Sequence, residues 1–128
     1  MVKANFHFNS LYAYSLFAFC PGILVAESFA SPENGVMFTY PNPSGDLARE
    51  FHTTDGGRTW ASVPISPSIL ELVRKGWSMG DLQMRTAAVG WLVMQYMSPI
   101  STSDDRSALF RTTDGGTTWR LMGTSPTP

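Results

Sequence analysis

Two copies of one short pattern constrain the fold of this chain more than any other feature of its sequence. Residues 51–60 read FHTTDGGRTW and residues 110–119 read FRTTDGGTTW, with eight of ten positions identical at an offset of 59 residues. The similarity extends upstream, where residues 35–38 align with residues 90–93 at an offset of 55, which places a four-residue insertion in the polar stretch before the second copy. Self-similarity of this kind indicates a repeat protein.

Each repeat divides into four short apolar segments separated by turn-forming residues. The first repeat is predicted to form strands near residues 25–31, 36–40, 47–53 and 58–63, and the second near residues 81–86, 90–97, 107–112 and 117–122. Between them, Ile69 to Gly76 predicts one or two helical turns ended by glycine. Four antiparallel strands per unit is the blade pattern of a β-propeller. The predicted fold class is therefore all-β, with two four-stranded antiparallel blades of an incomplete propeller.

The chain of 128 residues is predicted to contain a leader, two blades, a linker and a flexible tail. The boundaries are 1–26 for the leader, 27–64 for the first blade, 65–80 for the linker, 81–123 for the second blade and 124–128 for the tail. The first 26 residues carry Lys3 as their single formal charge and an apolar run from Leu11 to Ala26. This resembles a secretory signal and predicts a secreted or periplasmic location. Two other interpretations stay open: alternating strand residues at 5–9, or a reading frame that begins inside a longer gene.

The repeated motif has the form Thr-x-Asp-x-Gly-x-Thr-Trp, and its chemistry is that of a tight turn. Glycine accepts a positive φ without a Cβ penalty, and aspartate bonds to backbone N–H groups two residues on. Threonine suits strand ends, and tryptophan offers a large apolar body for packing. The residues assigned to this structural role are Thr53, Asp55, Gly57, Thr59 and Trp60 in the first copy, and Thr112, Asp114, Gly116, Thr118 and Trp119 in the second.

Both copies match the Asp-box motif, so the chain resembles the Asp-box family, also called bacterial neuraminidase repeats. In that family the motif is a structural turn, generally remote from any active site. The resemblance implies that neither Asp55 nor Asp114 is catalytic. Asp-box propellers include sialidases and other glycoside hydrolases, sortilin-type receptors and photosystem II assembly and stability factors. The stretches 90–93 and 109–116 look most like the last group, and uncharacterised secreted bacterial proteins look equally similar.

The sequence contains no recognisable set of catalytic residues. A glycosidase needs two carboxyl groups flanking the sugar, and the acids outside the motifs show no recognisable catalytic setting. The Arg-Ile-Pro signature of bacterial sialidases is absent. Asp104 and Asp105 are adjacent and lack the spaced ligands of a calcium loop, and the one cysteine, Cys20, is interpreted as an apolar residue. We therefore expect no catalytic residue, no metal and no cofactor.

Binding residues are equally sparse. Arg85 is placed by the repeat alignment on the innermost strand of the second blade, where propellers line their channel, and Arg49 and Arg111 are the other arginines considered for a basic patch. A net charge of −1 argues against nucleic acid as a partner, and no apolar run is long enough to predict a membrane-spanning helix. Arg85 is kept as a weak candidate for contact with a protein or glycan.

Two blades leave two sheet faces uncovered, because repeat units bury their faces only against neighbours. Three outcomes are open: a fragment of a longer gene, self-association that completes a propeller ring, or a two-sheet sandwich. The leading functional hypothesis is a non-catalytic propeller module that binds a protein or glycan and acts as an assembly or stability factor. The alternative is a fragment of a sialidase-like glycoside hydrolase that lacks its catalytic blades.

Overall fold

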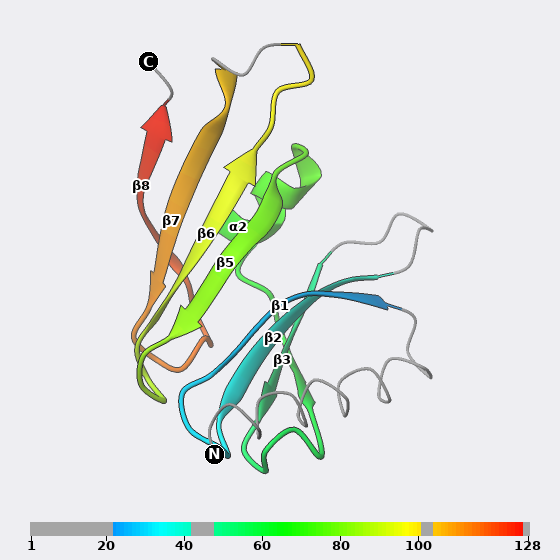
Figure 1. Ribbon diagram of the computed structural model, residues 1–128, viewed down its shortest axis with the longest axis vertical. Helices are drawn as coiled ribbons and strands as arrows, with labels where there is room; N and C mark the ends of the chain where they lie inside the picture. The colour runs from blue at the N-terminus through cyan, green and yellow to red at the C-terminus, as the bar shows by residue number, and fades with distance from the viewer. Residues whose placement is uncertain (1–21, 42–47, 101–103, 127–128) are drawn as a thin grey trace.

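The computed structural model describes residues 22–41, 48–100 and 104–126, which form two four-stranded antiparallel sheets with their strands in chain order (Figure 1). Blade 1 consists of β1 (Gly22–Phe29), β2 (Gly35–Pro41), β3 (Arg49–Thr53) and β4 (Ala61–Val63). Blade 2 consists of β5 (Ser78–Met84), β6 (Gly90–Tyr96), β7 (Arg106–Thr112) and β8 (Arg120–Pro126). A helix, α2 (Pro67–Arg74), connects them. The predicted all-β fold of two four-stranded antiparallel blades is confirmed.

Several segment boundaries differ from those expected. The range 1–26 assigned to a leader ends inside β1, and residues 1–21, with Cys20, lie outside the described part of the chain. β5 begins within the predicted linker because Ser78 pairs with Gln95. β8 extends into the predicted tail because the long strand β7 supplies pairing partners as far as Pro126.

Residues that align between the two repeats in sequence also occupy equivalent positions in the two sheets. Gly35 lies opposite Thr53 in blade 1, and Gly90 lies opposite Thr112 in blade 2. Further along the same strands, the pair Val36–His52 of blade 1 corresponds to the pair Trp91–Arg111 of blade 2. The pair Phe38–Glu50 likewise corresponds to Val93–Leu109. Each residue of the central strands therefore has a defined counterpart in the other blade.

The main core lies between the blades. One face of blade 1 contributes Val36 and Phe38, which are 4% and 0% exposed. The facing side of blade 2 contributes Leu82, Met84, Leu92, Met94, Ala108, Phe110 and Trp119. Successive residues of a strand point to opposite faces, so Met37 and Phe51 form a separate small cluster on the other side of blade 1. The apolar run in β2 is therefore explained by a strand that buries residues on both faces, whereas β6 buries Leu92 and Met94 on one face and leaves Trp91 and Val93 half-buried on the other.

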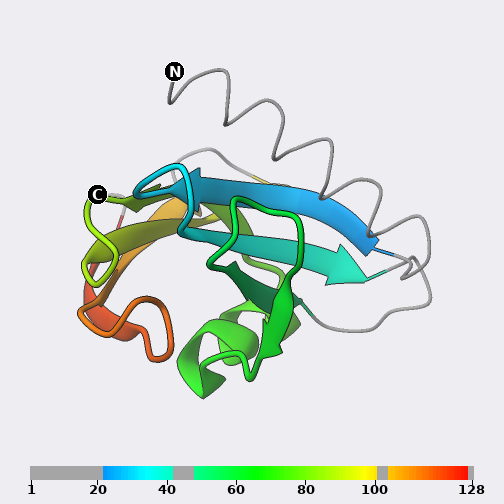
Figure 2. The same cartoon turned by 90° about the horizontal axis from the view of Figure 1, so that it is seen from below.

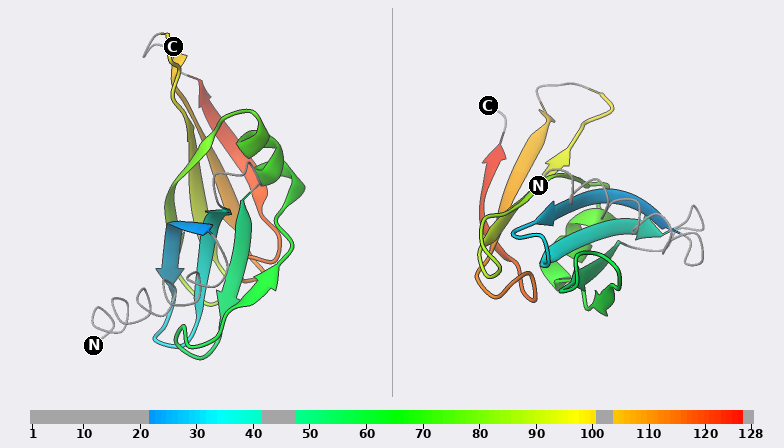
Figure 3. Two further views of the ribbon diagram at one scale, coloured as in Figure 1. Left: turned by 90° about the vertical axis from the view of Figure 1, so that its right-hand side faces the viewer. Right: turned by 60° about the horizontal axis from the view of Figure 1, so that its bottom comes forward.

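The inner strands of the two blades, β1 and β5, lie beside each other, and the sheets diverge from this line (Figures 2 and 3). Two hydroxyl groups of blade 1 accept hydrogen bonds from the backbone of β5. Ser28 Oγ accepts from Met84 N at 2.8 Å, and Tyr40 Oη accepts from Met79 N at 2.9 Å. These bonds satisfy N–H groups on a strand that has a sheet partner on one side only.

The helix α2 closes the core between the blades. Proline at its first position suits a helix start, since the missing N–H has no partner there. Ile69 is fully buried against the core, and Gly76 ends the helix with a φ of 93°. Within the described ranges, no helix is long and apolar enough to cross a membrane.

Two glycines of blade 2 allow a matched test of this packing. A Cβ at Gly90 would lie 2.9 Å from the carbonyl oxygen of Gln83 and would also collide with the Met84 side chain, whereas a Cβ at Gly123 would meet nothing within 4 Å. We expect Gly90→Ala to lower the free energy of unfolding by about 1–3 kcal/mol. Gly123→Ala should change it by less than about 0.5 kcal/mol. Urea denaturation measures both, and equal effects would contradict the strand packing described.

Candidate functional site

The first copy of the repeated motif forms a closed network of hydrogen bonds between β3 and β4. Thr53 Oγ1 donates to Asp55 Oδ1 at 2.8 Å and accepts from the backbone N of Gly57 at 2.9 Å. Asp55 Oδ1 also accepts from Thr59 N at 2.9 Å, and its Oδ2 accepts from Thr59 Oγ1 at 2.6 Å. Gly56 and Gly57 have φ values of 77° and 90°, which only glycine adopts without strain.

The second copy repeats this network between β7 and β8. Thr112 Oγ1 donates to Asp114 Oδ1 at 2.8 Å and accepts from Gly116 N at 2.8 Å. Asp114 accepts from the backbone N and the hydroxyl of Thr118, at 2.9 Å and 2.7 Å. The threonine, aspartate and glycine residues that make these bonds are therefore identical in the two copies.

The hydrogen bonds keep both aspartates ionised. Bonds from the Thr59 hydroxyl and backbone lower the pKa of Asp55 to about 2, and bonds from the backbone and hydroxyl of Thr118 lower the pKa of Asp114. A general acid at neutral pH needs the opposite shift, a raised pKa. The two carboxylates are therefore suited to holding the turn and unsuited to donating a proton.

Each motif also forms a hydrogen bond to the turn between the first two strands of its own blade. The N–H of Gly56 donates to the carbonyl of Glu33 at 3.0 Å, and the N–H of Gly115 donates to the carbonyl of Ala88 at 2.8 Å. Both acceptors belong to the turn between the first two strands of their own blade. The first glycine of the pair thus ties together two loops at the same end of the blade.

The two motif tryptophans have different surroundings. Trp60 Nε1 donates to the Gly57 carbonyl of its own turn at 3.0 Å, and its ring meets Phe29 at 5.8 Å between centroids. Trp119 instead reaches blade 1, where its ring meets Phe38 at 5.9 Å and its Nε1 donates to Glu50 Oε2 at 3.2 Å. Trp119 is 4% exposed and joins the two blades.

A buried acidic cluster lies at this junction. Glu50 is 0% exposed, and its Oε2 also lies 2.7 Å from His52 Nε2. Its other oxygen, Oε1, is buried and has no hydrogen-bond partner among the residues that the structure describes. Burial raises the pKa of Glu50, while the bonds from His52 and Trp119 oppose this shift. Sequence reasoning did not single out the cluster, although the spacing of Glu50 and His52 places them on one face of a strand.

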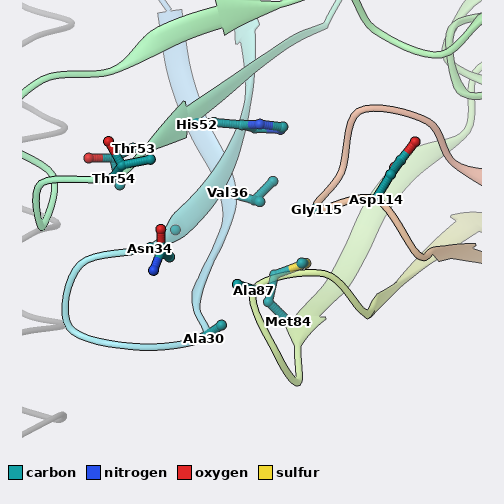
Figure 4. A pocket seen from close by; sticks show the side chains of 11 residues that line it. Ala30, Asn34, Val36, His52, Thr53, Thr54, Met84, Ala87, Asp114 and Gly115 are labelled. Carbon is teal, nitrogen blue, oxygen red and sulfur yellow. The ribbon is translucent and has the colours of Figure 1, made fainter.

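A cleft lies next to this cluster, between the ends of the blades (Figure 4). His52 points across it towards the second motif loop at Asp114 and Gly115, while Met84 enters it from blade 2 (Figure 4). Its volume is about 210 Å³. Small-molecule sites usually measure about 300–1,000 Å³. The cleft is therefore small for a sugar or a cofactor.

The three arginines that the sequence suggested for a basic patch lie in different parts of the structure. β5 ends at Met84, so Arg85 lies in the following turn, where it is exposed and its N–H bonds to the Val89 carbonyl at 2.8 Å. Arg49 opens β3 in blade 1, and Arg111 lies near the end of β7 in blade 2. The register instead places Arg111 opposite Arg120, a pair that sequence reasoning missed because β8 was expected to begin earlier.

Within residues 22–41, 48–100 and 104–126, no group of three or more histidine, cysteine, aspartate or glutamate residues is arranged to hold a metal ion. The adjacent acids of the β6–β7 loop do not form such a group, since Asp105 Oδ1 accepts from Ser98 N at 2.8 Å and Asp104 is exposed.

No protein-family model matches the chain, and no curated protein matches it. Among solved structures, the chain is similar to one described as "YCF48 bound to D1 peptide", with a TM-score of 0.40 and 16% sequence identity. The match covers 80% of this chain and 41% of that chain, so this chain spans less than half the length of the similar protein.

The hydroxyl of Thr112 lies at the centre of the hydrogen-bond network in the second motif. Thr112 is 1% exposed, and Thr112→Val keeps its shape but leaves the buried N–H of Gly116 without an acceptor. We expect the free energy of unfolding to fall by about 1–3 kcal/mol. The exposed neighbour Thr113 supplies the control, since Thr113→Val should change stability by less than about 0.5 kcal/mol. Similar losses for both variants in urea denaturation would refute the role given to the Thr112 hydroxyl.

The buried Glu50 predicts an unusual pH dependence of stability. Because its pKa in the fold is raised above 4.5, the folded state holds the proton more tightly than the unfolded state. Its contribution to stability is therefore greatest below that ordinary pKa and declines as pH rises through the pKa in the fold. Glu50→Gln removes this titration while keeping an acceptor for Trp119.

We expect the wild-type protein to lose stability relative to Glu50→Gln as pH rises above the ordinary carboxyl pKa of 4.5. Urea denaturation of both proteins at several pH values measures the difference, from which the titration of groups that are not in contact with Glu50 cancels. A difference that stays constant with pH would show that burial of Glu50 does not govern its ionisation.

Proposed function

We propose that this chain is a non-catalytic propeller module that binds a protein partner through the outer face of blade 2. We call this surface the open face. It lies on the side of blade 2 opposite the core residues Leu92 and Phe110. Its residues are Trp91, Val93, Leu109, Arg111, Arg120, Met122 and Gly123.

The observation that carries the proposal is the difference between equivalent faces of the two blades. In blade 1, Phe38 and Glu50 are both 0% exposed because blade 2 covers them. Their counterparts in blade 2 are Val93 and Leu109, and Leu109 is 38% exposed. The same sheet face is thus covered in one repeat and uncovered in the other, and an uncovered apolar patch marks an interaction site.

Further support comes from the carboxyl groups. The motif aspartates are held ionised by their turns, and Glu50, whose pKa is raised, is fully buried and cannot touch a substrate. These properties favour a binding module over a glycosidase. The sialidase-like fragment stays an alternative prediction without an observation that favours it.

Two finer statements belong to this proposal. The resemblance of the motifs to assembly and stability factors of photosystem II suggests that the bound partner is a subunit awaiting assembly. The composition of residues 1–26 suggests that binding takes place after export. A glycan partner and self-association are the other two possibilities that the sequence leaves open, and sedimentation of the purified chain would reveal self-association.

Peptide selection tests whether the open face binds protein. Peptides displayed on phage are selected on the purified full chain, and the affinity of each is then measured by fluorescence anisotropy. Gly123→Gln fills the open face at a position where the backbone has free space above it. We expect this variant to weaken binding at least about tenfold, as obstruction of a central contact does.

Leu121→Gln is the matched control, because Leu121 pairs with Phe110 and therefore lies on the opposite face of β8. Selected peptides should bind this variant as they bind the wild-type chain. Peptides that bind Gly123→Gln normally would contradict the assignment of the open face. Hydrolysis of reporter glycosides by the purified chain would replace the proposal with the glycosidase alternative.

A further inference from the structure

The open face carries two arginines directly opposite each other on neighbouring strands. Arg111 of β7 pairs in register with Arg120 of β8. Like charges in this arrangement repel each other. Within residues 22–41, 48–100 and 104–126, neither arginine forms an ion pair, and Arg111 Nε is buried without a hydrogen-bond partner. The guanidinium of Arg111 lies 5.8 Å from the centroid of the Trp91 ring. The positive charge is therefore held in place and uncompensated.

An apolar hollow adjoins this charge along the same face. It has a volume of about 410 Å³, and Val93, Leu109, Met122 and Gly123 contribute to its lining. Leu109 and Met122 are 38% and 46% exposed. Figure 1 shows that β7 and β8 form the side of blade 2 remote from blade 1. An occupant of this face must therefore be apolar along its middle.

Blade 1 shows what kind of group completes such a face. Its Glu50 accepts a hydrogen bond from the indole N–H of Trp119 of the covering sheet. In blade 2, the counterparts of Glu50 and His52 are Leu109 and Arg111. Leu109 thus stands where blade 1 has the acceptor Glu50, and the cationic donor Arg111 stands where blade 1 has His52. A protein that covers the open face must therefore present a hydrogen-bond acceptor at the position where Trp119 presents a donor to blade 1.

We infer that the open face binds a β-sheet surface of another protein that is apolar along its middle and carries an aspartate or glutamate opposite Arg111 and Arg120. This inference rests on the proposed function and narrows the chemistry of the partner. A carboxylate offers two acceptors to a guanidinium and relieves the repulsion between the two arginines. A second copy of this chain is not favoured, because its Trp60, at the repeat position of Trp119, already donates its indole N–H to Gly57 of its own turn and offers no acceptor.

Two synthetic β-hairpin peptides with the same apolar face test the inference. One carries glutamate at its central polar position and the other carries lysine, and each is titrated into the full chain by calorimetry. We expect the glutamate peptide to bind at least about tenfold more tightly, because close charge pairs across interfaces contribute more than this. The preference should shrink as salt is added.

Charge reversal at the exposed Arg120 supplies the decisive variant. Arg120→Glu should lower the preference for the glutamate peptide at least about tenfold, while Gly123→Gln weakens both peptides and Leu121→Gln weakens neither. Urea denaturation checks that each variant folds. Equal binding of the two peptides to the wild-type chain would overturn the acidic partner.

Other outcomes separate this inference from the proposed function. If neither hairpin binds while selected peptides still bind in a manner sensitive to Gly123→Gln, the inference fails and the proposed function stands. If sedimentation shows a dimer or ring that Gly123→Gln dissociates, the open face belongs to a second copy and the inference is overturned.

Discussion

Trp119 joins the repeated motif of blade 2 to the opposite sheet, and the packing of the two blades depends on it. Its backbone N donates to Ser66 Oγ at 2.9 Å, immediately before α2, and its ring lies against Phe38 of blade 1. Truncating a buried tryptophan costs about 3–5 kcal/mol, whereas a single hydrogen bond such as that to Glu50 contributes about 0.5–1.5 kcal/mol. Apolar packing therefore holds the blades together, and the hydrogen bonds fix the position at which they meet.

The burial of Glu50 is the exception to this apolar junction. A buried carboxyl group is tolerated when its oxygens have partners, and among the residues that the structure describes one oxygen has two while the other has none. Gly116 lies so close that a Cβ there would approach both Glu50 Oε2 and His52 Nε2 to 3.0 Å. The motif loop of blade 2 thus closes over the acidic cluster, and the positive φ of Gly116 favours glycine at this position.

The repeated motif made much of the fold predictable from the sequence, because its bonds are local. Thr112, Asp114, Gly116 and Thr118 lie within seven consecutive positions, so their turn follows from residue type and spacing. The cluster of Glu50 and Trp119 joins residues 69 positions apart, and no periodicity indicates such a contact. The opposition of Arg111 and Arg120 was also missed, because β8 was expected to begin before Arg120.

The comparison of the two blades separates residues that make the fold from residues that adapt a surface. Most of the positions that are identical in both copies of the motif lie in the turn, such as Thr53 and Thr112, whose hydrogen bonds close it. Several positions that differ lie on the sheet faces, where Glu50 corresponds to Leu109 and His52 to Arg111. Because the backbone register is the same in both blades, these differences do not arise from a different fold. They reflect different neighbours: a sheet of the same chain covers one face, and the other face presents apolar side chains and a fixed positive charge to what lies outside it.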